Sequence, residues 1–263
     1  MNIHTILSQT ERQRVSDGAV LPILNGCESS TKQLVLLLPQ LGDFDSLEYA
    51  WWLRRDSRQL EAQGIAIRVV GIGDRTAGER FCSYTGFPTD CLFVDPTAQL
   101  HQKLGLYPGL SLQLPGLSAA ANAYFNLLLM CAGIGSPGTL AEVFRGYRGD
   151  ARAPQLIDDG EVIKAFPLPA IKGSTFRWAG GKNFQRPFEL ATLRLRNMTE
   201  VLSNWKTYVP NPAYLTQRGA TFLFDARGDL IYEHRDLAIL GFAADMSNPL
   251  TFLSEMVADG DSL

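Results

Sequence analysis

The sequence predicts an α/β fold in which a central mixed sheet is flanked by helices and a large, mainly helical segment is inserted. Three observations support this prediction. Strand-like and helix-like runs alternate early in the chain, a β-hairpin pattern lies near its end, and about 110 residues separate the two, which is too long for a loop. The chain has 263 residues, 46% of them hydrophobic and 19% charged, enough for one large domain with a substantial core.

The first half of the predicted core covers residues 34–104. Leu34–Leu38 is an unbroken apolar run, typical of a strand that is buried on both faces. Ser46–Gln63 has apolar residues at helical spacing and stops at Gly64, and Ile65–Ile72 is rich in β-branched residues, as in a strand. A helix, a strand and a helix follow at Thr76–Tyr84, Cys91–Val94 and Ala98–Leu104. This alternation indicates parallel strands with right-handed crossovers.

The second half of the core is expected at residues 218–263. Ala220–Phe224 and Asp229–Glu233 are apolar runs on either side of the turn residues Asp225–Gly228, which is the pattern of a β-hairpin. Pro249–Val257 predicts a final helix. Strand–helix alternation followed by a hairpin and a helix is the chain order of a thioredoxin-like fold. Residues 1–33 are then an N-terminal extension, and residues 105–217 are the insertion.

The insertion is predicted to be helical and locally basic. Its helix patterns cover Ser118–Cys131, Thr139–Gly146 and Phe188–Trp205. From Lys164 to Lys206, eight Lys and Arg stand against two Glu, a local charge of +6 in a chain of net charge −3. This segment is either a solvated basic face or a docking surface for an acidic protein or an anionic headgroup, and aromatic residues are too sparse for nucleic acid. The candidate docking residues are Lys164, Lys172, Arg177, Lys182, Arg186, Arg194 and Arg196.

A glycine-rich motif at Gly133–Gly138, GIGSPG, matches the GxGxxG pattern of dinucleotide sites. Such a site needs a preceding strand. The run before the motif is rich in Ala and Leu and predicts a helix instead. We therefore interpret the motif as a corner between two helices, with Ser136 and Pro137 starting the second, and keep a nucleotide site as the alternative.

Cysteine usage and hydropathy argue against several other classes of protein. None of the four cysteines forms a CxxC pair or has zinc-ligand spacing with a histidine, so neither a metal nor a cofactor is predicted. Cys27 is expected in an exposed loop and Cys131 in the core. The first residues lack a signal-peptide pattern, and the longest apolar stretch, Ala119–Gly135, is too short and too polar to span a membrane. We expect a soluble, cytoplasmic protein and leave attachment to a membrane surface through a partner open.

Three segments carry a family resemblance: LVLLLPQLGDFDSLEYA, RFCSYTGFPTDCLFVDP and QRGATFLFDARGDLIYEHRD. With them the chain resembles the AhpC/TSA-type peroxiredoxin-like proteins of cyanobacteria and plastids, relatives of the peroxiredoxin-like 2 group. The resemblance extends nearly end to end, including GIGSPGTLAEVFRGYRGD and NMTEVLSNWKTYVPN in the insertion. It implies a thioredoxin-like fold and is compatible with a homodimer.

The resemblance places a degenerate reactive-site loop at Pro39–Ser46. The family pattern PxxxTxxC supplies a shielding proline, a threonine that aligns the peroxide and the attacking cysteine. Here Asp43 stands at the threonine position and Ser46 at the cysteine position. A serine hydroxyl cannot replace a low-pKa thiolate, and Asp43 adds negative charge where a thiolate needs a positive field. Together with Asp45 these residues suit a helix N-terminus instead, so the loop should keep its shape without its reactive atom.

The resemblance also implies an arginine beside the thiolate, for which Arg218 is the candidate. Arg218 lies one residue earlier than the family pattern, so its side chain should point to the opposite face of the strand unless Gly219 permits a bulge. Cys82 lies on the helix where one peroxiredoxin class carries its resolving cysteine. It is a candidate redox thiol, alone or with Cys91, and the alternative is a buried, inert thiol.

Three functional hypotheses follow. The first is a binding, assembly or regulatory module whose partner is a protein with an acidic surface; the resemblance points to a membrane-associated photosynthetic complex at the thylakoid surface. The second is a thiol oxidoreductase or redox sensor of the antioxidant type, which requires an exposed, low-pKa Cys82 near a basic group such as Arg80. The third is an enzyme of another kind that uses the acidic loop or the glycine corner.

Overall fold

A seven-stranded mixed sheet forms the centre of the computed structural model, which describes residues 2–27, 30, 32–150, 153–180 and 188–253. Its strand order is β2-β1-β5-β4-β3-β8-β9, with β3, β4 and β5 parallel and the other pairs antiparallel. The strands are β1 (Glu11–Arg14), β2 (Val20–Pro22), β3 (Lys32–Gln40), β4 (Ile65–Ile72), β5 (Leu92–Val94), β8 (Ala220–Asp225) and β9 (Leu230–Arg235). The mixed, thioredoxin-like sheet predicted from the chain order is confirmed.

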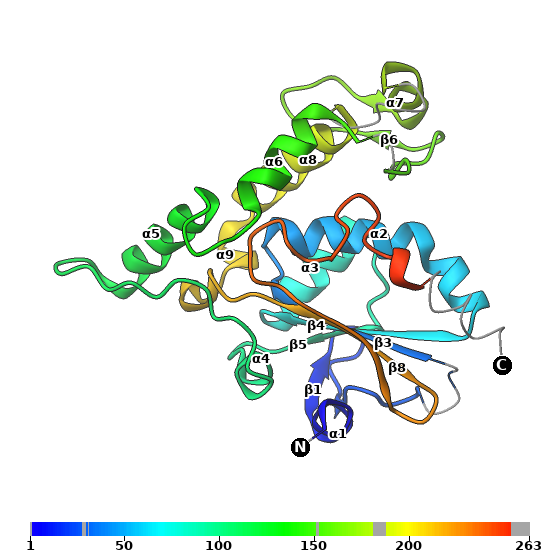
Figure 1. Cartoon of the computed structure of the whole chain (residues 1–263), viewed down its shortest axis with the longest axis vertical. Helices are drawn as coiled ribbons and strands as arrows, with labels where there is room; N and C mark the ends of the chain where they lie inside the picture. The colour runs from blue at the N-terminus through cyan, green and yellow to red at the C-terminus, as the bar shows by residue number, and fades with distance from the viewer. Residues whose placement is uncertain (1, 28–29, 31, 151–152, 181–187, 254–263) are drawn as a thin grey trace.

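Helices cover both faces of this sheet (Figure 1). On one face lie α2 (Phe44–Ala62) and α3 (Arg75–Thr85), and on the other lie α1 (Ile3–Gln9) and α4 (Gln99–Lys103). Successive side chains of a strand point to opposite faces, so alternate leucines of β3 pack under α2 while Val35 and Leu37 pack against α1 and α4. Burial on both faces explains why β3 is an unbroken apolar run.

The N-terminal residues, which were predicted to be an extension, contribute one helix and two strands to the fold. They form α1, β1 and β2, and β1 pairs antiparallel with β5, with Gln13 opposite Val94. Two strands are thereby added to one edge of the sheet. Their sequences, ERQR and VLP, are short and carry no clear alternation of apolar and polar residues, so no strand is predicted there.

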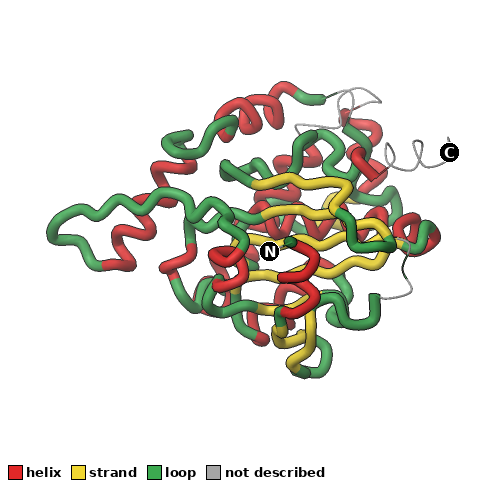
Figure 2. The backbone as a smooth tube through the Cα atoms, turned by 60° about the horizontal axis from the view of Figure 1, so that its bottom comes forward, coloured by secondary structure: helices red, strands yellow, loops and turns green. Residues whose placement is uncertain are grey.

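The segment between the two halves of the core is largely helical, as predicted. Figures 1 and 2 show α6 and α8 beyond α2, and α5 with its preceding loop projecting from the body. The helices are α5 (Ala119–Cys131), α6 (Thr139–Arg148), α7 (Gly173–Gly180), α8 (Phe188–Ser203), α9 (Trp205–Tyr208) and a 3-10 turn at Pro212–Tyr214. A two-stranded sheet of β6 (Val162–Ile163) and β7 (Ile171–Lys172) was not predicted. The division of the chain at residues 34, 105 and 218 stays a prediction.

The predicted final helix lies only partly within the described residues. Thr251–Leu253 are helical, and residues 254–257 lie outside the described part of the chain.

Arg194 of α8 connects the segment between the core halves to α2. Its guanidinium Nε donates to Glu48 Oε2 at 2.8 Å, and its NH2 group donates to Glu142 Oε1 of α6 at 3.0 Å. Glu48 is fully buried, and a buried carboxylate needs such a cation. Because Arg194 is neutralised inside the chain, this geometry argues against the docking role predicted for it.

Replacing Arg194 tests this connection. We expect Arg194→Met to lower the free energy of unfolding by about 3 kcal/mol, because it takes the cation from the buried Glu48. Urea denaturation measures the change. Arg14→Met, which removes the exposed pair between Arg14 and Asp17, is the matched control and should leave unfolding nearly unchanged. An Arg194→Met variant as stable as this control would show that the pair contributes no net stability.

Candidate functional site

The loop Pro39–Ser46 connects the end of β3 to the start of α2. Asp43 is the N-cap of α2, and its side chain accepts a hydrogen bond from the backbone N–H of Asp45 at 3.0 Å. Asp45 lies in the first turn, where a carboxylate interacts favourably with the helix dipole. The acidic residues therefore form a helix N-terminus, which begins at Phe44, two residues before the predicted start.

Ser46, which the resemblance predicts at the position of a reactive cysteine, is fully buried. Its hydroxyl donates to the backbone carbonyl of Gln40 at 2.9 Å. This bond closes the loop on itself, so the hydroxyl is a structural donor and does not face solvent.

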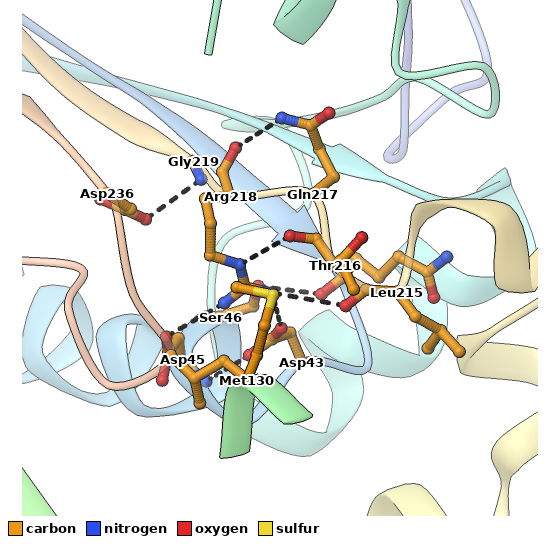
Figure 3. A network of polar contacts seen from close by, with 12 residues as sticks. Asp43, Asp45, Ser46, Met130, Leu215, Thr216, Gln217, Arg218, Gly219 and Asp236 are labelled. Atoms are coloured by element: carbon orange, nitrogen blue, oxygen red, sulfur yellow. Dashed lines mark hydrogen bonds and ion pairs between the residues drawn. The ribbon is translucent and has the colours of Figure 1, made fainter. Parts of the chain in front are cut away.

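Arg218 reaches the same loop from the segment before β8 (Figure 3). Its NH2 group donates to Asp43 Oδ2 at 2.5 Å, and its NH1 group lies 3.4 Å from Asp45 Oδ2. Further bonds run from the guanidinium to the backbone carbonyls of Leu215 and Thr216. Arg218 has no exposed surface, and the loop carboxylates provide its counter-charge.

Arg218 points toward the loop, the alternative that the sequence left open through an irregularity at Gly219, because Arg218 is not part of the strand. The pairing of β8 with β3 ends at Ala220, opposite Leu37. The N–H of Gly219 bonds to the side chain of Asp236 at 3.2 Å, and a Cβ atom on Gly219 would lie 2.1 Å from the carbonyl oxygen of Leu37. Only glycine allows this approach of the two backbones, after which the chain turns Arg218 toward the loop.

A third carboxylate, Asp236, completes the cluster and was not predicted. Asp236 directly follows β9. Acidic residues are common just after strands, so the sequence does not mark this one as part of a site. Burial raises its pKa to about 7, while Arg218 and the N–H of Gly219 act in the opposite direction. Burial also raises the pKa of Asp45 well above its ordinary value, and the neighbouring Asp43 raises it further. The raised pKa values mean that the carboxylate cluster tends to bind a proton. A site that stabilises an anion would have the opposite effect on a bound group.

A small cavity of about 80 Å³ lies beside the loop, lined by Asp43, Phe44, Cys131, Trp205 and Leu215 among others. Cys131, predicted in the core, is exposed and lines this cavity. Cys131 is the last residue of α5 and follows Met130, which occupies the buried side of the helix. Cys27 was predicted to be exposed but is fully buried, because the chain turns back on itself there, with the N–H of Cys27 bonded to the carbonyl of Leu24.

The candidate redox thiols lack the properties that the redox hypothesis requires. Cys82 is only 4% exposed, and burial raises its pKa to about 12. Burial likewise raises the pKa of Cys91 to about 11. Arg80, the basic group that the redox hypothesis requires near Cys82, instead forms an ion pair with Glu200 on α8 at 2.6 Å. Thiols with such pKa values are protonated near neutral pH and react slowly.

Of the predicted basic docking residues that the structure describes, Lys164 and Lys172 are exposed, whereas Arg194 and Arg196 contact other parts of the chain. Lys164 and Lys172 are exposed in and beside the β6–β7 sheet. The guanidinium of Arg196 lies over the rings of Trp51 and Tyr84, at 4.8 and 4.9 Å from their centres. Lys182 and Arg186, and the side chain of Arg177, lie outside the described residues.

The glycine corner Gly133–Gly138 joins two helices, α5 and α6. Ser136, predicted to start α6, precedes the actual N-cap, Gly138, and its hydroxyl instead accepts the N–H of Ile239 at 2.7 Å. The corner is thereby fastened to the segment after β9. No strand precedes it, so the geometry of a dinucleotide-binding turn is missing.

Two further searches covered the described residues alone. Within them no group of three or more His, Cys, Asp or Glu side chains could hold a metal ion. In the same part of the chain, every helix is too short or too polar to cross a bilayer.

Comparison with known proteins adds one match. Residues 52–237 match the family model described as AhpC/TSA antioxidant enzyme. No curated protein and no solved structure matches the chain. The matched range includes Arg218 and the segment between the core halves, whereas the loop Pro39–Ser46 lies before its start.

The protonated cluster makes a pH dependence testable with Asp236→Asn. The wild-type free energy of unfolding should fall as pH rises from about 4 to about 7, because the unfolded chain releases the Asp236 proton first. The variant lacks this loss, so the two curves should diverge by about 2–4 kcal/mol, at roughly 1.4 kcal/mol per pKa unit. Urea denaturation across this range measures both curves.

Asp17→Asn is the matched control for this pH series. Asp17 is exposed, and its hydrogen bond with Arg14 lowers its pKa to about 2, below the range tested. Its substitution should leave the slope between pH 4 and 7 unchanged. Equal slopes for the wild type and Asp236→Asn would show that Asp236 is ionised throughout the range.

Proposed function

Because the chain belongs to the AhpC/TSA antioxidant enzyme family but carries serine at the reactive position, we propose that it is a thioredoxin-fold binding or assembly module without peroxidase activity. The main support is the chemistry of the loop. Reduction of a peroxide needs a thiolate that attacks one peroxide oxygen and an access path to that thiolate. Ser46 supplies neither, since its hydroxyl is buried and bonded to Gln40.

The electrostatics of the loop support the same proposal. In the family pattern the arginine would stabilise a thiolate, but here its positive charge is balanced by Asp43 and Asp45. An anionic nucleophile or intermediate placed at this site would be repelled by these carboxylates. The alternative function, thiol chemistry at Cys82 with Cys91, receives no support from two buried thiols with raised pKa values.

The partner that we propose is a protein with an acidic surface, which would bind or be regulated through the basic segment. Lys164 and Lys172 are the exposed cations of the β6–β7 sheet and its connection. Their ammonium groups are suited to steering and holding acidic side chains. The resemblance to proteins of cyanobacteria and plastids makes a membrane-associated photosynthetic complex at the thylakoid surface our candidate for this partner.

A peroxide-consumption assay with dithiothreitol as reductant tests the loss of peroxidase activity. We expect the wild type, Ser46→Ala and Cys82→Ser to consume hydrogen peroxide at the same low rate. This is because neither side chain offers an accessible thiolate. A wild-type rate that falls tenfold or more in either variant would contradict the proposal and identify that side chain as the reacting group.

Charge reversal at the β6–β7 sheet tests the acidic partner, with poly-L-glutamate as the probe. The wild type should bind this probe in a salt-sensitive manner, and the variant Lys164→Glu/Lys172→Glu should bind at least about tenfold more weakly. Lys103→Glu/Arg227→Glu makes the same charge change at exposed residues elsewhere and is the matched control. Equal weakening by both variants would show only a net-charge effect and no docking surface.

A further inference from the structure

We call Leu104–Ala141 the uncharged segment, because its 38 residues include no Asp, Glu, Lys, Arg or His. It comprises the chain after α4, helix α5, the glycine corner and the first residues of α6. Both overall views show α5 and the loop before it projecting from the body (Figures 1 and 2). A projecting segment of a protein surrounded by water normally carries charged side chains. This segment carries none.

Several apolar side chains of the uncharged segment face outward, while Leu104, Leu106 and Met130 are buried. Leu128 on α5 is 68% exposed, and Ile134 in the corner is 52% exposed. Such a concentration of exposed apolar side chains marks an interaction surface. Its large exposed apolar residues are Leu112, Leu114, Leu117, Tyr124, Leu128, Ile134 and Leu140.

Helix α5 buries two asparagines and exposes Leu128, although Met130 is also buried and its neighbours Ala123 and Leu127 pack against the core. Asn126 accepts the N–H of Leu112 at 3.1 Å and donates to its carbonyl at 3.0 Å. Asn122 accepts the N–H of Leu114 at 2.9 Å and donates to the carbonyl of Leu117 at 3.4 Å. These backbone groups of the loop are thus satisfied by side chains and need no water. Backbone that enters a hydrocarbon environment must meet this requirement.

Next to the uncharged segment lie residues suited to a lipid headgroup region. The indole N–H of Trp205 donates to the hydroxyl of Tyr124 at 2.8 Å, and their ring centres are 5.8 Å apart. Tyrosine and tryptophan favour the boundary between acyl chains and water. Lys206 follows Trp205, is exposed, and has no ion-pair partner among the described residues. The charge distribution therefore complements an anionic bilayer, with an uncharged end for the acyl region and a cation beside it for the headgroups.

We propose that the uncharged segment inserts into the interfacial region of an anionic lipid bilayer and holds the protein at the membrane surface. The segment is not a spanning element, because α5 has 13 residues. The proposal concerns a surface separate from Lys164 and Lys172 and does not rest on the loss of peroxidase chemistry.

Vesicle flotation tests the proposal, with vesicles of phosphatidylcholine and phosphatidylglycerol. The wild type should float with these vesicles, and less with vesicles of phosphatidylcholine alone. Leu128→Glu should weaken partitioning about tenfold or more, because it places a charge where the proposal puts a leucine among the acyl chains. Val20→Glu, at a 60% exposed position on β2, is the matched control and should float like the wild type. Circular dichroism checks that both variants are folded.

Three outcomes would overturn the proposal. The first is a wild type that stays in the aqueous fraction, and the second is equal flotation of Leu128→Glu and Val20→Glu. The third is a wild type that forms dimers without binding vesicles and becomes monomeric in Leu128→Glu, as measured by light scattering. That third result would assign the surface to a second copy of the chain. None of these outcomes depends on the peroxide assay, so the two proposals fail separately.

Discussion

A fully buried arginine is the constraint around which the reactive-site loop is organised. An isolated charge away from water is strongly unfavourable, so Arg218 requires carboxylates nearby. Asp43 and Asp45 provide them from the start of α2. Asp45 also accepts the N–H of Leu240, and Asp236 accepts the N–H beside Arg218. Three segments that are distant in sequence therefore meet at one guanidinium, and none could change its charge without disturbing the others.

The same constraint relates the two departures from the family pattern to each other. A thiolate at position 46 would give the arginine a negative partner, and a neutral serine cannot. We interpret Asp43 as the replacement for that charge, since its carboxylate lies 2.5 Å from Arg218. On the proposal that the chain is no peroxidase, this exchange would stabilise the loop and leave it without a group that reduces peroxides.

In the segment between the core halves, two arginines are directed inward and part of the apolar surface is directed outward. Arg194 neutralises a buried glutamate of α2, and Arg196 lies on the rings of Trp51 and Tyr84. The local charge of +6 therefore overstates what a partner would meet. On α5 the asparagine side chains form hydrogen bonds with the loop backbone, and Leu128 and its neighbours face away from the body. The segment therefore has two distinct surfaces, one that carries exposed charges and one, on and around α5, that carries none.

Pattern and composition by themselves determined the central strands, the main helices and the absence of a thiol at Ser46. A strand buried on both faces, such as β3, needs apolar residues in any context. The polar edge strand β1 carried no such signal, because its partner comes from a distant part of the chain. Only the tertiary structure decided the direction of Arg218, which depends on where pairing stops. Burial is likewise decided by what packs from elsewhere, which is why Cys27 is enclosed and Cys131 is exposed.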